Sequence, residues 1–65
     1  MTTAVQSVDR ALTLLELIAA DPEGRRLSDL ARAADLAPST THRLLTALET
    51  RGFVQTDATT GLWHI

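Results

Sequence analysis

Apolar residues recur with the period of an α-helix in three stretches of this 65-residue chain, and with the period of a strand in two short stretches near its end. Residues 1–6 precede the first stretch and are predicted to form a loose arm. Ser7 is a candidate N-cap for a helix that stops at the turn residues 21–24. The predicted buried face of this helix consists of Val8, Ala11, Leu12, Leu15, Ile18 and Ala19.

Two leucines of the first helix, Leu14 and Leu17, lie well off that predicted face. One interpretation is that both are simply exposed, which is common in folded proteins. The other is that they form a second contact surface, for a dimer partner or for the rest of a longer chain. Leu14 and Leu17 are therefore candidate dimer contacts.

The second helical stretch is short. Ser28 is a candidate N-cap for about two turns of helix, and Leu27 before it is a candidate for a brief edge strand. Residues 35–37 then separate this helix from the third, which is the spacing of a helix-turn-helix. Asp35 occupies the position where such a turn needs a positive φ, a conformation that aspartate tolerates better than most residues.

The third helix is predicted over residues 38–51. Pro38 suits its first position, and Gly52 is placed for a left-handed C-terminal cap. Its buried face combines Thr41, Leu44, Leu45 and Leu48. Its outer face combines Ser39, Arg43, Thr46 and Thr50, with Thr40 and Ala47 beside them. Short hydrogen-bonding side chains around one guanidinium can approach a groove closely, so this helix is predicted to be a DNA recognition helix.

The end of the chain reads as a hairpin. Residues 53–56 and 62–65 are predicted strands around the turn residues 57–61, and alternation places Trp63 and Ile65 on the core side. Three helices followed by a hairpin define a mainly α fold, the winged helix-turn-helix, as one domain over residues 1–65.

The charge balance is unusual for a DNA-binding protein, because the net charge is -2 and all six basic residues are arginines. Most of the acids lie before residue 36, which leaves the predicted reading half neutral. We therefore expect weak non-specific DNA affinity from a single copy. The chain has no cysteine, no signal-peptide pattern and no membrane-length apolar run, so a cytoplasmic location is expected.

Several stretches of the chain resemble the N-terminal DNA-binding domain of the isocitrate-lyase-regulator (IclR) type of bacterial transcription regulators. The most specific of them is Ser39 to Leu45 followed by Gly52-Phe53-Val54. The others are residues 6–12, 27–31 and 36–38. Two departures stand out. Thr41 occupies a position that is more often apolar and β-branched, and the wing lacks the basic residue often found near Leu62.

The resemblance implies properties that the spacing of residues does not. Such proteins bind operator DNA as dimers or dimers of dimers, and first-helix contacts help to pair their DNA-binding domains. They usually carry a larger effector-binding domain after the wing, where a small molecule would bind, and these 65 residues do not include it. Ser39, Thr40 and Arg43 match the recognition-helix positions of the family.

Arg43 is the best candidate for base reading, because arginine can bond guanine O6 and N7 together and no acid stands three or four residues away. Ser39, Thr40 and Thr46 are further candidates for groove contacts, although ordinary capping also explains the first two. His42 is placed at the flank of the outer face. Ser28 is a possible phosphate contact, although capping alone explains it.

Enzymatic and metal-binding interpretations find little support. Ser39 and His42 lack an orienting acid, and His42 and His64 lack further ligands. We expect no enzyme activity, cofactor or metal. The predicted function is sequence-specific binding of double-stranded DNA by a bacterial transcriptional regulator, whose two-fold pair reads half-sites one helical turn or a multiple apart. The alternative is a winged-helix module for protein interaction or dimerisation, which the acidic balance and the leucines of the first helix favour.

Overall fold

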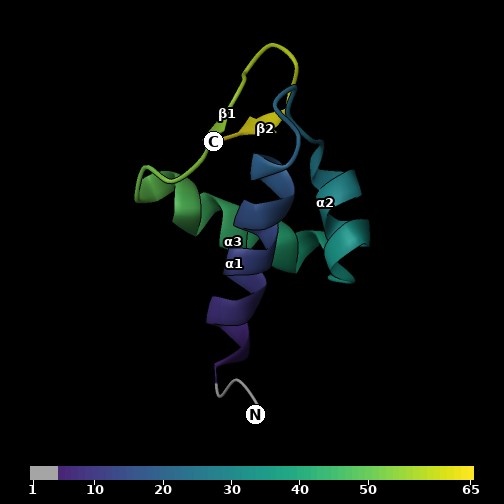
Figure 1. Ribbon diagram of the computed structural model, residues 1–65, viewed down its shortest axis with the longest axis vertical. Coiled ribbons are helices and arrows are strands. Elements are labelled where there is room, and N and C mark those ends of the chain that lie inside the picture. Colours follow the sequence, from purple (N-terminus) through teal and green to yellow (C-terminus); the bar gives the residue numbers. More distant parts are fainter. Residues whose placement is uncertain (1–4) are drawn as a thin grey trace.

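A computed structural model describes residues 5–65 of the chain. This part of the chain forms three helices and a two-stranded antiparallel sheet (Figure 1). The elements are α1 (Gln6–Ala19), α2 (Leu27–Ala34), α3 (Pro38–Thr50), β1 (Gln55–Thr56) and β2 (Trp63–His64). The predicted fold class, a mainly α winged helix-turn-helix, is confirmed.

The start of α1 differs from the prediction. Gln6 is already helical, and the N-cap is Val5, whose extended backbone carries no side-chain capping bond. Ser7 is therefore the second helical residue, and its assignment as N-cap is wrong. The predicted arm over residues 1–6 is wrong for Gln6, while residues 1–4 lie outside the described part of the chain. All residues from Val5 to Arg10 are exposed, so the first turns of α1 stand clear of the core.

The buried face of α1 also differs from the prediction. Leu14 is 0% exposed and Ile18 is 1% exposed, whereas Val8 and Leu12 are 54% and 52% exposed. Leu17 is partly buried and packs against the core. The prediction that Leu14 and Leu17 lie off the buried face is therefore wrong, and their role as dimer contacts loses its structural basis. The helix presents the side of Leu14 and Ile18 to α2 and α3.

The turn between α2 and α3 follows the prediction. Asp35 has φ 57° and ψ 48°, in the left-handed region. Two backbone bonds close this end of α2, from the Leu36 amide to the Ala31 carbonyl at 2.9 Å and from the Asp35 amide to the Arg32 carbonyl at 3.2 Å. These are the paired bonds of a Schellman motif, which satisfies carbonyls at the helix end and turns the chain sharply. The small Ala31 is buried at this turn.

The start of α2 does not follow the prediction. The N-cap is Arg26, without a side-chain capping bond, and Leu27 is the first helical residue. Ser28 is therefore inside the helix and is not its cap. The predicted edge strand at Leu27 is also wrong, because the bridge to the hairpin is made two residues earlier by Arg25.

The third helix has one enclosed side. Pro38 occupies its first turn as predicted, and Thr41 and Leu45 are both 0% exposed. The Thr41 hydroxyl donates to the Ala37 carbonyl at 3.0 Å, so its polar atom is satisfied and its methyl is free to pack. Gly52, at φ 83°, ends the helix. Its amide bonds the Glu49 carbonyl at 2.9 Å, as the predicted left-handed cap requires.

The hairpin is shorter than predicted. Gln55 pairs with His64 and Thr56 with Trp63, and the Trp63 main chain also exchanges two bonds with Arg25 at 3.1 and 2.8 Å. Trp63 is 5% exposed, which confirms its core position. Ile65 is 57% exposed, so its predicted core position is wrong. It lies past the end of β2, where the strand pairing that would hold it over the core has stopped.

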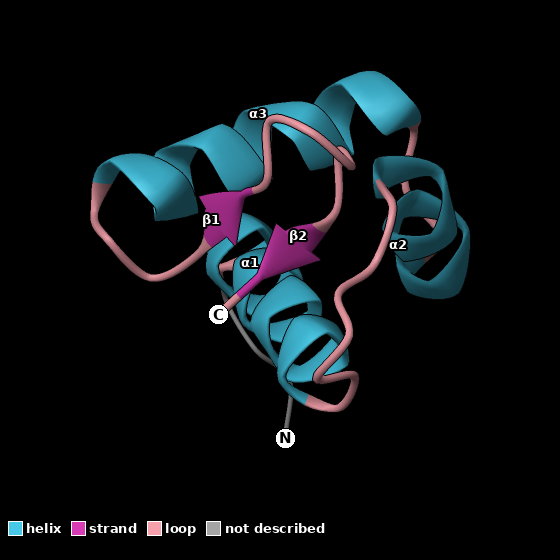
Figure 2. Cartoon of the chain, turned by 90° about the horizontal axis from the view of Figure 1, so that it is seen from above, coloured by secondary structure: helices cyan, strands magenta, loops and turns pink. Residues whose placement is uncertain are grey.

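The core lies where α1, α2, α3 and the hairpin meet. Its buried apolar members are Leu14, Ile18, Leu30, Leu45, Val54 and Trp63. Both α1 and α2 pack against α3, and the side of α3 at the top of Figure 2 faces away from them. The outer side of α3 is thus left uncovered. None of the helices within residues 5–65 is long and apolar enough to cross a membrane.

The burial of α1 predicts unequal effects for two leucines of the same helix. Leu14→Ala is expected to lower the free energy of unfolding by about 2–5 kcal/mol, because it leaves a cavity in the core. Leu12→Ala is the matched control and is expected to change it by less than about 0.5 kcal/mol. Urea unfolding followed by circular dichroism at low protein concentration measures both values. Equal losses would contradict the assignment of the buried face.

Candidate nucleic-acid interface

The uncovered side of α3 carries the predicted reading residues. All four residues of the predicted outer face are exposed. They are Ser39, Arg43, Thr46 and Thr50. They stand opposite Thr41 and Leu45, which the core encloses. The burial of one side therefore forces the other outward, and the prediction of two faces is confirmed.

The remaining predicted contact residues take different positions. His42 is exposed at the flank of the outer side, while Thr40 is half-buried near the start of α3. Ser28 is exposed in the first turn of α2, which lies beside the N-terminal half of α3 (Figures 1 and 2). The fold thus gathers Thr40, His42 and the outer face onto one helix and adds Ser28 from its neighbour.

Arg43 is available for a ligand. Within residues 5–65 it makes no ion pair, whereas Arg25 and Arg32 each stand near an acid of their own segment. Those contacts are loose, with 4.0 Å between Arg25 Nε and Asp21 and 3.8 Å between Arg32 and Asp29. An unpaired guanidinium on an exposed helix face keeps all five donors free for an acceptor-rich surface.

The start of α3 adds backbone donors. The Ala37 N-cap has an extended backbone and makes no side-chain capping bond, and Pro38 has no amide hydrogen. The amides of Ser39 and Thr40 are left without a partner from a capping side chain, and the helix dipole places partial positive charge there. This end of the helix suits a negatively charged oxygen.

Arg26 was not among the predicted contacts. It is exposed and immediately precedes α2, at the N-cap position. A cation there is unfavourable for the helix dipole, so it is not explained by helix stability. In the sequence it stands in a connector beside Arg25, and only the position where α2 begins distinguishes the two arginines.

The wing loop is closed by a carboxylate rather than lined by cations. The Asp57 carboxylate accepts the Thr59 amide at 2.8 Å and the Thr60 amide at 3.4 Å. These two bonds, in that order, are the largest causes that hold the pKa of Asp57 below its ordinary value of 3.8, and the charge of His64 contributes less. From Gly52 to Ile65 the sequence has no lysine or arginine. The wing therefore offers no lysine or arginine to a phosphate.

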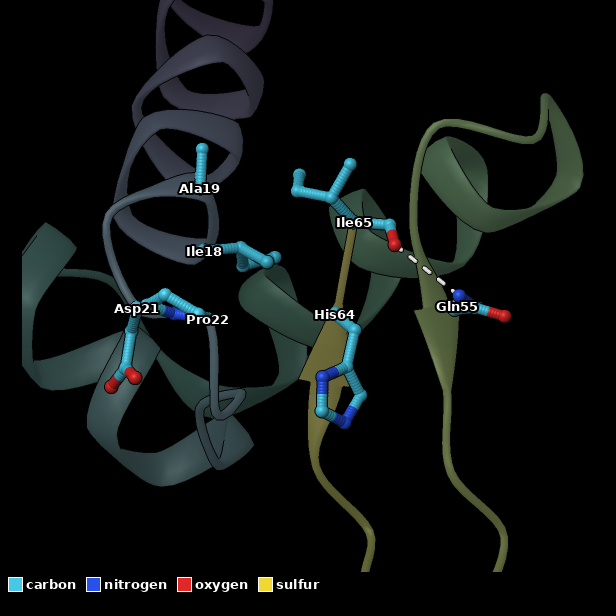
Figure 3. A pocket seen from close by; sticks show the side chains of 7 residues that line it. All are labelled: Ile18, Ala19, Asp21, Pro22, Gln55, His64 and Ile65. Atoms are coloured by element: carbon cyan, nitrogen blue, oxygen red, sulfur yellow. Dashed lines mark hydrogen bonds between the residues drawn. The ribbon is translucent and has the colours of Figure 1, made fainter.

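A cleft of about 340 Å³ lies on another part of the surface, between the end of α1 and the hairpin (Figure 3). Its lining residues are Ile18, Ala19, Asp21, Pro22, Gln55, His64 and Ile65. On the hairpin side of the cleft, Gln55 donates from Nε2 to the Ile65 carbonyl at 3.2 Å. The His64 ring lies against Gly24, where a Cβ would come within 2.5 Å of the ring. None of the predicted contact residues lines this cleft, which is the seam that holds the wing.

The arrangement of the described elements defines a winged helix-turn-helix domain that presents an uncovered third helix. The model of the IclR helix-turn-helix domain matches residues 7–58. The chain belongs to the IclR helix-turn-helix family of DNA-binding transcription regulators.

Three relatives illustrate the similarity. The transcriptional repressor IclR of Escherichia coli is 47% identical over 64 residues, which cover 98% of this chain and 23% of that protein. The acetate operon repressor of Salmonella typhimurium is 45% identical over 65 residues, covering 100% of this chain and 24% of that protein. The HTH-type transcriptional regulator BhcR of Paracoccus denitrificans is 43% identical over 61 residues, covering 94% and 22%. The chain spans about a quarter of the length of these relatives.

The hydrogen bonds that Asp57 accepts in the wing loop are expected to depend on pH. The pKa of Asp57 is lower in the folded chain than in the unfolded one, so its contribution to stability is present above pH 3.8 and is lost as the pH falls through the folded pKa. The amide proton shifts of Thr59 and Thr60, followed by NMR, should therefore change with a midpoint below 3.8. Asp57→Asn should abolish this titration. A midpoint above 3.8 would contradict the bonding seen here.

Proposed function

We propose that this chain binds double-stranded DNA sequence-specifically, with α3 in the major groove, as the reading module of a bacterial transcriptional regulator. The observation that carries the proposal is the outer side of α3, where Arg43 stands among short hydroxyl side chains and has no ion-pair partner within the described residues 5–65. The major groove, about 12 Å wide, admits an α-helix. Short side chains let the helix axis approach the base edges closely.

Each predicted residue has a proposed role. Arg43 bonds guanine O6 and N7, which is the commonest specific contact in the major groove. Ser39 and Thr40 donate to a phosphate or a base edge at the start of α3, where the free amides also favour an anion. Thr46 contacts the groove one turn further on, and His42 touches the backbone at the flank.

The neighbouring helix supplies phosphate contacts in this proposal. Ser28 and Arg26 stand at the start of α2, where a phosphate would satisfy the helix dipole and offset the unfavourable position of the Arg26 charge. These contacts position the helix in the groove and carry no sequence information of their own.

The relatives suggest the setting. Two of them are named repressors, one of an acetate operon. We propose that this chain likewise serves regulation in the bacterial cytoplasm, as part of a longer regulator with an effector-binding domain. The chemistry of the module is recognition rather than catalysis, because its exposed side combines donors and methyl groups without an oriented nucleophile and base.

Base reading by Arg43 has a direct test. Arg43→Ala should weaken binding to a duplex selected from random sequences by about 1–3 kcal/mol and leave binding to unselected DNA nearly unchanged. Arg43→Lys keeps the charge but cannot make the bidentate contact. It should therefore lose most of the affinity for the selected duplex that Arg43→Ala loses. Fluorescence anisotropy with both duplexes measures the difference.

Arg10→Ala is the matched control, because it removes the same charge from an exposed position in the first turns of α1, off α3. It should leave the ratio of the two affinities unchanged. Unaltered operator affinity in Arg43→Ala would rule out the proposed role of Arg43. A chain with no affinity for any duplex would favour the protein-interaction module instead.

Pairing of two copies is the second part of the proposal. Val5, Val8 and Leu12 are 50%, 54% and 52% exposed and stand at spacings of three and four residues, so they form one stripe along α1. This stripe lies on the first turns of α1, which stand clear of the core, and short helical segments without packing are marginal in water. A second copy that packs on the stripe would stabilise both segments.

The stripe replaces Leu14 and Leu17 as the expected dimer contact. Three side chains make a small interface compared with the roughly 800 Å² per partner of stable complexes. Pairing by this module alone is therefore expected to be weak in solution and to act on adjacent half-sites. It would compensate for the scarcity of positive charge on each copy.

Disruption of the stripe is expected to impair the pairing of two copies without impairing the binding of each copy to DNA. Val8→Glu with Leu12→Glu should remove cooperative binding to a duplex with two half-sites and keep the affinity for one half-site, because α3 is untouched. Ala20→Glu with Ala33→Glu adds the same charges at exposed positions off the stripe and serves as control. Electrophoretic mobility titrations with one-site and two-site duplexes give both affinities. Cooperativity that survives the α1 substitutions would show that another surface pairs the copies.

A further inference from the structure

Two exposed side chains on or beside the outer side of α3, Ala47 and Thr50, take no part in the proposed contacts. After Pro38, Ala47 is the only exposed residue of α3 with an apolar side chain. It stands one helical turn beyond Arg43, on the edge of the same outer side. Its methyl group is therefore exposed on the same side of the helix as the Arg43 side chain.

One of the polar side chains near Ala47 already makes a hydrogen bond within the helix. The Thr50 hydroxyl donates to the Thr46 carbonyl at 2.9 Å, so its hydrogen is used within the helix. The outer face is left with the donors of Arg43 and the hydroxyls of Ser39 and Thr46. The sequence of α3 contains no asparagine, glutamine or lysine. The helix thus lacks the amide side chains that recognise adenine through paired bonds.

An exposed methyl group has one matching feature in the major groove. Among the four bases only thymine presents a 5-methyl group there, and alanine is one of the residues that contacts it. Four residues along a helix correspond to about 6 Å, while successive base pairs are about 3.4 Å apart. A helix that lies along the groove would place the Ala47 methyl about two base pairs from the base that Arg43 reads.

We propose that α3 recognises a guanine through Arg43 and a thymine 5-methyl group through Ala47, with the two bases about two base pairs apart. The inference rests on the proposed function, because it requires α3 to enter the major groove. It goes further in assigning the kind of half-site: one guanine for hydrogen bonding and one thymine for apolar contact. Ala47 is then a specificity-determining residue rather than a solvent-exposed helix former.

The first test changes only the DNA. Sites are selected from random duplexes with the intact 65-residue chain, and each thymine near the required guanine is replaced in turn by deoxyuridine, which lacks only the methyl group. One replacement, about two base pairs from the guanine, should weaken binding about fourfold, the effect of one lost CH₂-sized contact. Cytosine at the same place should also bind more weakly. 5-Methylcytosine should recover part of the loss, because its methyl group occupies the same ring position.

The second test changes the protein. Ala47→Gly removes the methyl group and should bind the thymine and deoxyuridine duplexes equally. Circular dichroism checks that this helix, weakened by glycine, is still folded. Ala33→Gly, at an exposed position of α2, is the matched control and should keep the preference for thymine. If Ala47→Gly does not fold, binding that is insensitive to deoxyuridine would still overturn the inference.

The outcomes separate the two proposals. A selected site with a required guanine but no sensitivity to deoxyuridine would overturn the role of Ala47 and leave the proposed function standing. A preference for thymine that persists in Ala47→Gly would assign the methyl contact to another residue and overturn the inference as well. Failure to select any sequence would instead overturn specific DNA binding.

Discussion

The complete enclosure of one side of α3 is the constraint on which the rest of this structure depends. Thr41 and Leu45 have no exposed surface, and both α1 and α2 pack against α3. The Thr41 hydroxyl would oppose this burial if it lacked a partner, but it bonds the Ala37 carbonyl within its own helix. With that side fixed, the rotation of α3 about its axis is fixed as well, and Ser39 and Arg43 are held outward.

Two sharp turns hold α3 in this place. The left-handed Asp35 ends α2, and the left-handed Gly52 ends α3, each with the paired backbone bonds of a Schellman motif. The first turn sets the angle between the two helices, and the second sends the chain into the wing. Trp63 then ties the wing to the connector before α2 through its two bonds with Arg25. A chain of only 65 residues thus holds an exposed reading surface on a small core.

Positive charge is scarce on the exposed surface of this chain. Of the six arginines, two stand near acids of their own segments, and the wing has none. A module with so few free cations gains little from phosphate neutralisation, so in the function we propose its discrimination depends on close contacts with base edges and on a second copy. In that proposal, the small side chains of α3 allow the close contacts and the exposed stripe of Val8 and Leu12 pairs the copies.

Much of the fold could be predicted because the apolar and polar positions of α3 and the hairpin follow regular helical and strand periods. In α3 the apolar and polar positions separate onto two sides, so its period alone identified Thr41 and Leu45 as buried and Arg43 as exposed. Local chemistry was equally decisive at Asp35, Pro38 and Gly52, where few residue types fit the backbone. The positions of the candidate contacts on α3 therefore agreed with the structure, although their roles stay predictions.

The amino-acid sequence by itself determined which segments are helices, where two of the turns stand and which side of α3 is buried, because these depend on contacts only a few residues apart. The tertiary structure decided the rest. In α1 leucines occur on every side, so only the positions of α2 and α3 selected Leu14 over Leu12 for the core. Ser7 and Ser28 are within a turn of a helix start, yet the helices begin ahead of them, at Gln6 and Leu27. Where leucines occur on every side of a helix, as in α1, burial depends on the assembled elements, and the period of that helix alone cannot predict it.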